Sequence, residues 1–307
     1  SPFTFIASAN AICFVGAIPV FADIDPFTFN LDPKAVEPLI TKKTKAIMPV
    51  HIFGLPADMG VFRDLADDND LYLIEDACQA HGGRINGQSV GSFGDINCFS
   101  FFATKNMIAG EGGMVTTNNE ELAEKCRSIK NHGRAASASG GYMHYRIGYN
   151  LRLADINAAI ALVQLRKLPR FLEQRAKNAA IYRKHFAENE AFRFQHVPPG
   201  FTHANYIFAL CLEPSAKRPV SDVINHLKSQ NIGCRPIYDI PVYRQQTYKN
   251  IKMWRWAQAG VPYPDYQQLS FSNTEYIAKH HFEIPVNPAV SEKDATFIAE
   301  TLLSLFS

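Results

Sequence analysis

Short apolar runs alternate, through the first part of the chain, with stretches in which apolar residues recur at helical spacing. The runs 19–24 and 46–53 are each followed by such a stretch, at 33–40 and 56–67, and a third run covers 71–74. This alternation is typical of βαβ units, so it predicts a mainly parallel sheet with helices on both faces. Binding sites in such sheets lie at the carboxyl ends of the strands.

The pattern then continues toward the middle of the chain. Two further strands and a helix preceded by capping asparagines are expected at 96–102, 113–117 and 119–130. A loop rich in glycine and serine, 135–141, separates them from a long helical region at 153–186. We expect Pro169 to split that region into two helices, because proline removes a hydrogen bond from a helix interior.

The pattern changes after Glu190. The expected elements are a strand in "NYIFALCLE", a helix at 220–230, an extended segment at 233–243 and a closing helix at 292–306. We therefore predict two domains. Residues 1–190 form a large domain with its linking helices, and residues 191–307 form a smaller α/β domain.

Charge and cysteine content argue against several kinds of partner. The chain of 307 residues has a net charge of +2 and no basic block, so we expect neither a nucleic-acid nor a membrane-surface partner. No apolar run is long enough to span a bilayer. The six cysteines stand singly, so we expect no metal site and no disulfide framework, but reduced thiols in a cytoplasmic protein.

Two charged residues are expected at the carboxyl ends of neighbouring strands. Lys105 follows the apolar run in "SFFATKNMIAGEGG", and Asp76 ends the run "LYLIED". A lysine that attacks a carbonyl and an acid that pairs with a ring nitrogen are the two groups that pyridoxal phosphate requires. An internal salt bridge between Asp76 and Lys105 is the alternative, and their spacing alone favours neither.

The residues around this pair favour a bound cofactor. Ser100 stands at the end of a strand, where its hydroxyl can donate to a phosphate, and the glycines of 110–113 permit close approach of the backbone. Gln79 and His81 follow Asp76 within one turn, where they can bond a ring hydroxyl.

Four motifs stand in order along the chain: "IEDACQAHGG" (74–83), "FSFFATKNMIAGEGGMVTT" (99–117), "NHGR" (131–134) and "GYNLRLADINAAIALVQL" (148–165). Together they resemble the DegT/DnrJ/EryC1/StrS family of sugar aminotransferases, which are fold-type I pyridoxal-phosphate enzymes. The similarity runs from "FTFIASANAICFVG" to "EIPVNPAVSEKD", so it covers essentially the whole chain. It implies a three-layer α/β fold with a mainly parallel sheet and a smaller C-terminal α/β domain.

The resemblance also implies roles for single residues. Lys105 matches the lysine that bonds pyridoxal 5'-phosphate and moves protons, and Asp76 matches the acid that keeps the pyridine nitrogen protonated. Gln79 matches a residue near the phenolic oxygen of the cofactor, and Ser100 matches a phosphate ligand. Phe5 falls where the family places an aromatic ring stacked on the cofactor.

Other matches concern the partner subunit and the substrate. Asn150 matches a residue that reaches the phosphate from the partner, which implies a homodimer with shared active sites. His132 and Arg134 are candidates for contacting a nucleotide-sugar phosphate, although a histidine after a helix also suits the helix dipole. Tyr238 and Tyr243 either line the sugar pocket or pack in the small domain.

The function that the resemblance implies is transfer of an amino group from glutamate to a nucleotide-linked keto-deoxysugar, by a ping-pong mechanism, in the biosynthesis of amino sugars for polysaccharides or antibiotics. One alternative is a sugar dehydratase of the same family, but such relatives typically carry histidine in place of Lys105. The other is a non-catalytic regulatory or assembly protein. Family members begin with helices and a Gly-Thr loop that have no counterpart before Ser1, so we interpret the chain as lacking that N-terminal segment.

Overall fold

The computed structural model describes residues 1–135 and 143–306, so most of the expected loop at 135–141 lies outside the described residues. Its main sheet has four strands in the order β1-β2-β5-β6. These strands are β1 (Ala46–Ile47), β2 (Tyr72–Asp76), β5 (Ile96–Ser100) and β6 (Gly113–Thr116). The first three are parallel and β6 is antiparallel, which confirms the predicted mainly parallel sheet of an α/β fold.

Helices cover both faces of this sheet, as predicted. The helix α3 (Met59–Asp68) packs its apolar stripe around Leu73 of β2, in a buried cluster. The helix α1 (Ala7–Phe14) reaches the same strand from the other side, because Ser8 bonds to Asp76. Leu73 and Asp76 are three residues apart in one strand, so their side chains point to opposite faces.

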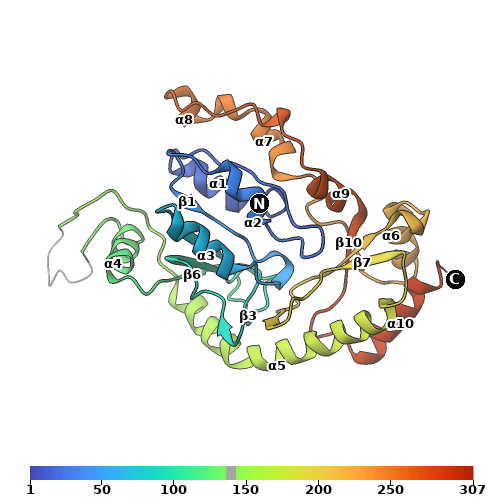
Figure 1. Cartoon of the computed structure of the whole chain (residues 1–307). Coiled ribbons are helices and arrows are strands. Elements are labelled where there is room, and N and C mark those ends of the chain that lie inside the picture. Colours follow the sequence, from blue (N-terminus) through green and yellow to red (C-terminus); the bar gives the residue numbers. More distant parts are fainter. Residues whose placement is uncertain (136–142, 307) are drawn as a thin grey trace.

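A second, antiparallel sheet forms the core of the smaller unit, seen at the right of Figure 1. Its strands are β7 (Phe192–Phe194), β9 (Phe208–Leu212) and β10 (His281–Ile284). The helices that share its buried core are α6 (Val220–Ser229), α10 (Glu292–Leu303) and the last turns of α5 (Asp155–Phe186). The strand in "NYIFALCLE" and the two helices expected after residue 190 are thus confirmed, while the domain boundary itself stays a prediction.

The helix α5 is continuous over 32 residues, so the expected split at Pro169 is wrong. A proline leaves the carbonyl four residues earlier, that of Leu165, without its helical donor. Both residues lie on the exposed side of the helix, where water can replace that donor. Leu168 packs beneath the main sheet and Tyr182 packs in the small core, so packing on both sides of the proline keeps the helix in one piece.

The segment 242–271 does not join the small core but returns to the N-terminal region, where Figure 1 shows α7 and α8 above α1. It contains η4 (Val242–Arg244), α7 (Gln246–Lys249), η5 (Ile251–Met253), α8 (Arg255–Gln258) and η6 (Tyr266–Gln268). Tyr243 is fully buried there and donates its hydroxyl to Glu275 at 2.7 Å. Tyr243 is thus a packed residue, but it packs against the N-terminal region and not in the core of the small unit, as one of the two predictions had it.

Two early strands are much shorter than expected. The run 19–24 is extended but pairs only through an isolated bridge from Ile24 to Leu31. The run 46–53 yields the two residues of β1, then a bridge at Val50 and the short helix η2 (Ile52–Gly54). Pro49 interrupts this run, and a proline has no N–H to donate to a neighbouring strand.

The remaining elements are α2 (Pro33–Val36), η1 (Glu37–Leu39), β3 (Arg84–Ile85), β4 (Gln88–Ser89), α4 (Glu120–Ile129), β8 (Phe201–Thr202), η3 (Pro214–Ala216) and α9 (Ser272–His280). Asn119 caps α4, as expected, by accepting from the N–H of Leu122 at 3.1 Å. All six cysteines are free thiols. Within the described residues, no group of ligand side chains could hold a metal ion, and no helix is both long and apolar enough to cross a membrane.

Candidate active site

Asp76 ends β2, and the backbone fixes it there. Its N–H donates to the carbonyl of Pro49 at 3.0 Å, and its carbonyl accepts from the N–H of His51 at 3.1 Å. Its carboxylate accepts on one oxygen from the hydroxyl of Ser8 at 2.7 Å and on the other from the N–H of Cys78 at 3.1 Å. These two donors come from different elements, so the orientation of the carboxylate depends on both.

Ser8 was not singled out from the sequence. It lies in the first turn of α1, and its N–H donates to the carbonyl of Phe5 at 3.2 Å. The motif "FTFIAS" does offer a signal, since a hydroxyl three residues after an aromatic residue returns to the same side of a helical turn. Ser8 thereby connects the backbone of Phe5 to the carboxylate of Asp76.

Lys105 lies in the turn that follows β5. The turn is closed by the bond from the N–H of Lys105 to the carbonyl of Phe102 at 3.0 Å. Gly112, in the glycine-rich stretch that follows this turn, has a φ of +132°, and a Cβ atom there would lie 2.5 Å from Leu153. Only glycine therefore fits at this position without displacing Leu153.

The predicted alternative of an Asp76–Lys105 salt bridge is not formed among the described residues. The ammonium of Lys105 lies instead over the ring of Tyr206, 4.8 Å from its centre. Both charges nevertheless act on the thiol of Cys78, whose pKa is raised by burial and further by Asp76, while Lys105 opposes that change. Because β2 and β5 are parallel neighbours, with Asp76 opposite Cys98, Asp76 and the turn that carries Lys105 lie at the same edge of the sheet.

Gln79 is buried and links this region to a wall of aromatic rings. Its Oε1 accepts from the N–H of Phe53 at 2.9 Å, and its Nε2 donates to the hydroxyl of Tyr238 at 3.1 Å. The ring of Tyr238 stacks on that of Phe53, with centres 6.0 Å apart, and meets that of Phe3 edge to face. Burial raises the pKa of the Tyr238 hydroxyl, so this tyrosine is neutral.

Phe5 and Ser100 lie at the border of this region. The side chain of Phe5 is 59% exposed. Phe5 lies just before α1, the helix whose Ser8 donates to the carboxylate of Asp76. Ser100, the last residue of β5, accepts from the N–H of Phe102 at 3.3 Å and keeps its own hydroxyl hydrogen for another acceptor. Phe5 thus offers an uncovered aromatic ring, and Ser100 offers a hydroxyl donor at the end of β5.

His81 does not point at an open site. It is buried and lies near the rings of Phe99 and Phe101, with centres 5.2 Å and 6.2 Å from its own. Burial, with a smaller effect of Lys105, lowers the pKa of His81 to about 4. His81 is therefore a neutral core residue at neutral pH.

Asn150 and His132 are placed apart from Asp76 and Lys105. Asn150 forms a backbone bridge with Asn131, and the N–H of His132 donates to the carbonyl of Tyr149 at 2.9 Å. Arg134 pairs through its backbone with His144 in the same arm. This arm lies by α4, beyond the outer strand β6 (Figure 1).

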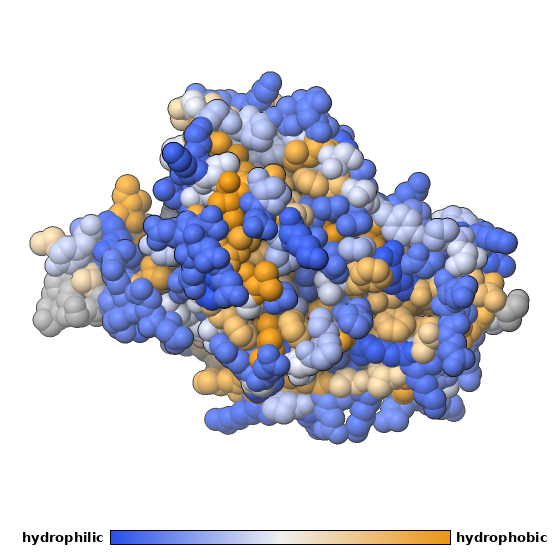
Figure 2. Space-filling view, in the orientation of Figure 1, coloured by the Kyte–Doolittle hydropathy of each residue, from blue (hydrophilic) through white to orange (hydrophobic). Residues whose placement is uncertain are grey.

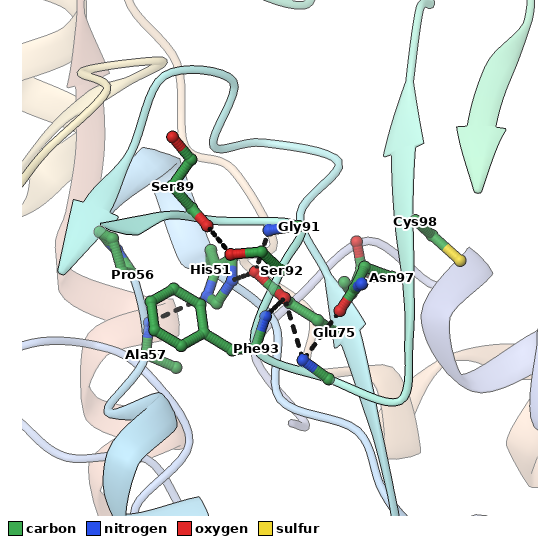
Figure 3. Close-up of polar contacts among 12 residues, drawn as sticks. His51, Pro56, Ala57, Glu75, Ser89, Gly91, Ser92, Phe93, Asn97 and Cys98 are labelled. Atoms are coloured by element: carbon green, nitrogen blue, oxygen red, sulfur yellow. Dashed lines mark hydrogen bonds and ion pairs between the residues drawn. The ribbon is translucent and has the colours of Figure 1, made fainter. Parts of the chain in front are cut away.

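A buried polar network lies on the opposite face of β2 (Figure 3). Glu75 is fully buried and accepts from Nε2 of His51 at 2.8 Å, from the N–H of Phe93 at 3.1 Å and from the N–H of Gly91. Nδ1 of His51 accepts from the N–H of Ala57 at 2.9 Å, so His51 is the neutral tautomer with its proton on Nε2. Burial alone would raise the pKa of Glu75, but these donors lower it overall.

The comparisons with known proteins agree over the whole chain. A model of the DegT/DnrJ/EryC1/StrS aminotransferase family matches residues 1–303. A pleiotropic regulatory protein of Geobacillus stearothermophilus is 38% identical over 306 residues, which cover 99% of this chain and 77% of that protein. UDP-N-acetyl-3-dehydro-alpha-D-glucosamine 3-aminotransferase of Acidithiobacillus ferrooxidans is 36% identical over 301 residues, which cover 98% and 75% of the two chains.

The comparison with solved structures also finds an aminotransferase that matches the whole chain. The Helicobacter pylori aminotransferase PseC, described as involved in the biosynthesis of pseudoaminic acid, superposes with a TM-score of 0.89 at 26% identity. The match covers 100% of this chain and 78% of that one.

Proposed function

Because the chain belongs to the DegT/DnrJ/EryC1/StrS aminotransferase family, we propose that it transfers an amino group from glutamate to a nucleotide-linked keto-deoxysugar with pyridoxal 5'-phosphate as cofactor. Aminotransferase activity follows from the family; the substrate, the donor and the residues that act are the proposal. It is supported above all by the placement of Asp76 at the end of β2 and of Lys105 in the turn after β5, two neighbouring parallel strands.

The residues of this region fit pyridoxal phosphate. The ring of Phe5 is exposed, and the carbonyl of Phe5 accepts from Ser8, the donor to Asp76, so this ring suits a flat heterocycle stacked on it. Gln79 has a second N–H on Nε2 beyond the one given to Tyr238, and Ser100 has a free hydroxyl hydrogen for a phosphate oxygen. An amine, an acid, an aromatic face and neutral donors are the groups that such a cofactor needs.

When bound, pyridoxal phosphate supplies an aldehyde that condenses with amines and a ring that withdraws electrons. With that group bound, the amine of Lys105 would hold it through the aldehyde and, once glutamate has taken that place, would move a proton from the donor carbon. The carboxylate of Asp76, oriented by Ser8 and the N–H of Cys78, would hold the proton on the pyridine nitrogen. The same two residues would serve the sugar half of the reaction, so ping-pong kinetics are expected.

The nucleotide-sugar substrate is supported by what relatives are named for, including the aminotransferase of Acidithiobacillus ferrooxidans that acts on a UDP-linked sugar. We assign Tyr238 to the sugar side of the site, because it borders Gln79. His132 and Arg134 are proposed to contact the nucleotide phosphates. Lys105 favours amination over dehydration, since dehydratases of the family typically carry histidine at this position.

A homodimer would bring Asn150 into a site. Large apolar side chains are exposed over the first half of α5 and the adjoining arm: Tyr145, Ile147, Tyr149, Leu151, Ile156, Leu162, Val163 and Leu165. Figure 2 shows hydrophobic side chains at the surface along the lower edge, where α5 runs. We propose that a second copy covers this surface and that Asn150 then reaches the partner's phosphate site.

Two measurements test the proposed function. The purified chain, mixed with pyridoxal phosphate, should gain a visible absorption band that Lys105→Ala lacks, and the wild type should convert glutamate to 2-oxoglutarate with a member of a panel of nucleotide keto-sugars. Lys105→Ala should lower the rate by ~10²–10⁴-fold, as for loss of a residue that moves a proton. A wild-type protein that never forms the band would refute the proposal.

A further inference from the structure

The segment 203–207 runs from the small core toward the turn that carries the reactive lysine. The N–H of Ala204 donates to the carbonyl of Gly54 at 2.8 Å, and the N–H of Ile207 donates to that of Phe53 at 3.2 Å. Phe53 is also the residue that Gln79 bonds. These backbone bonds fix the segment against the wall of the candidate site.

Two further residues hold the same segment. Asn106, directly after the lysine, donates from its side chain to the carbonyl of Ala204 at 2.9 Å. Arg175 of α5 is buried and donates to the carbonyls of Asn205 and Tyr206, each at 3.1 Å. Burial lowers the pKa of Arg175 to about 10, so it stays charged at neutral pH and binds these carbonyls strongly. The position of Tyr206 is thus set by the lysine turn, the short helix η2 and the long helix α5 together.

Tyr206 makes two contacts with the lysine turn. Its hydroxyl bonds to Oγ1 of Thr104 at 3.0 Å, and its ring lies under the ammonium of Lys105 at 4.8 Å from the ring centre. A cation over an aromatic face is attracted by the ring quadrupole. No carboxylate among the described residues pairs with this ammonium, so the ring is its defined contact.

We propose that Tyr206 is a positioning residue for Lys105: its ring holds the amine at the site before cofactor or substrate takes it, and its hydroxyl fixes the turn through Thr104. This inference rests on the proposed function, because it assigns a place to the amine that acts there. It differs from simple packing in a testable way, since the ring and the hydroxyl act through separate contacts.

Three variants separate these contacts. Tyr206→Leu removes the ring and the hydroxyl, Tyr206→Phe removes the hydroxyl alone, and Thr104→Val removes the partner of that hydroxyl. The first measurement is the rate at which an amine acetylating reagent labels Lys105 in the cofactor-free full chain, read by peptide mass spectrometry and normalised to the exposed Lys42. The second is the rate at which the visible band grows after addition of pyridoxal phosphate.

We expect Tyr206→Leu to label Lys105 ~2–5-fold faster than wild type, because the amine leaves the ring, and to form the band more slowly by a similar factor. Tyr206→Phe and Thr104→Val should give smaller, equal effects. Their double variant should add nothing, because both remove the same hydrogen bond.

Unchanged labelling and band growth in Tyr206→Leu would overturn the inference. If Tyr206→Leu fails to fold by circular dichroism, the other two variants decide, since additive effects of Tyr206→Phe and Thr104→Val would contradict the shared bond. The labelling is done without cofactor, so its result stands even if the wild type shows no aminotransferase activity. Failure of the inference is thereby distinguished from failure of the proposed function.

Discussion

At the scale of single residues, the candidate site consists of groups held by neighbours that the chemistry does not use. Ser8 orients Asp76, and the backbone of Phe53 orients Gln79. The amine of Lys105 lies over the ring of Tyr206, a residue that is distant in the sequence. A carboxylate that must hold a proton on a ring nitrogen has to be fixed in direction as well as in place. The supporting residues are therefore as informative to mutate as the acting ones.

Ser8→Ala should weaken binding of pyridoxal phosphate. The hydroxyl of Ser8 donates to the carboxylate of Asp76 at 2.7 Å, and a hydrogen bond to a charged group contributes ~1.5 kcal/mol or more, so the dissociation constant should rise about tenfold. Fluorescence titration of the cofactor-free chain measures this constant. Ser8→Thr keeps a hydroxyl and serves as the control. An alanine variant that binds as tightly as wild type would show that the Cys78 N–H alone orients Asp76.

At the scale of elements, β2 carries a bonded carboxylate on each of its two faces. Its last residue, Asp76, points to the candidate site, while the preceding residue, Glu75, points to the loop that leads into β5. The N–H groups of Gly91 and Phe93 both donate to Glu75 (Figure 3), so the buried carboxylate fastens this loop to the strand. Asp95 adds a second attachment, because it accepts from the N–H of Leu73 at 2.7 Å.

Glu75→Gln should lower the free energy of unfolding by ~2–4 kcal/mol. The new amide group would place an N–H where the carboxylate accepts donors, which leaves buried groups unpaired. Urea unfolding followed by circular dichroism measures the change. Glu173→Gln, on the exposed side of α5 where Glu173 pairs with Lys177, is the matched control and should change stability by less than ~1 kcal/mol. Equal small effects in both variants would contradict a structural role for Glu75.

Pro169→Ala should raise the thermal unfolding midpoint. The helix α5 is already continuous through Pro169, and alanine would restore the N–H that the carbonyl of Leu165 lacks, with a gain of ~1–3 kcal/mol. Differential scanning calorimetry measures the midpoint. Since Pro169 is exposed, the substitution removes little packing. A lower midpoint would mean that the proline sets a bend on which the packing of α5 depends.

At the scale of the whole molecule, several buried cores are joined by one long helix and by segments that return from the end of the chain to its beginning. The core beneath the main sheet contains Leu168 of α5, and the core of the small unit contains Tyr182 of the same helix. Two buried histidines lie close to these cores: His81 lies near the rings of Phe99 and Phe101, and His281 of β10 lies against Phe3 and Phe53. Stability should therefore depend on pH through these two side chains.

The protein should lose stability as pH falls from about 6.5 to about 4. Burial lowers the pKa of His81 and of His281 to about 4, from an ordinary value near 6.5. Between those values the unfolded chain binds protons that the folded chain does not, so acid favours unfolding, by up to ~3 kcal/mol for each histidine. Urea midpoints at pH 7.5, 6 and 5 measure the loss. His81→Phe should lose less over this range; an identical slope in that variant would exclude His81 as a cause.

Several of the elements, and the pair of charges, can be predicted from the sequence alone. Local apolar periodicity predicts β2, β5, α3 and the capped α4, because each pattern acts within a few residues. Lys105 and Asp76 were identified because a charge directly after a buried strand is unusual and because motifs of the family surround them.

The surroundings of that pair depend on how the whole chain folds. Tyr206 and Tyr238 come from parts of the chain more than 100 residues beyond Lys105, and no local pattern distinguishes them from the buried Tyr243. The continuity of α5 through Pro169 also depends on packing at both of its ends. Contacts between distant segments and the competition of packing with local propensity are set only when the chain is folded, which is why the sequence alone did not reveal them.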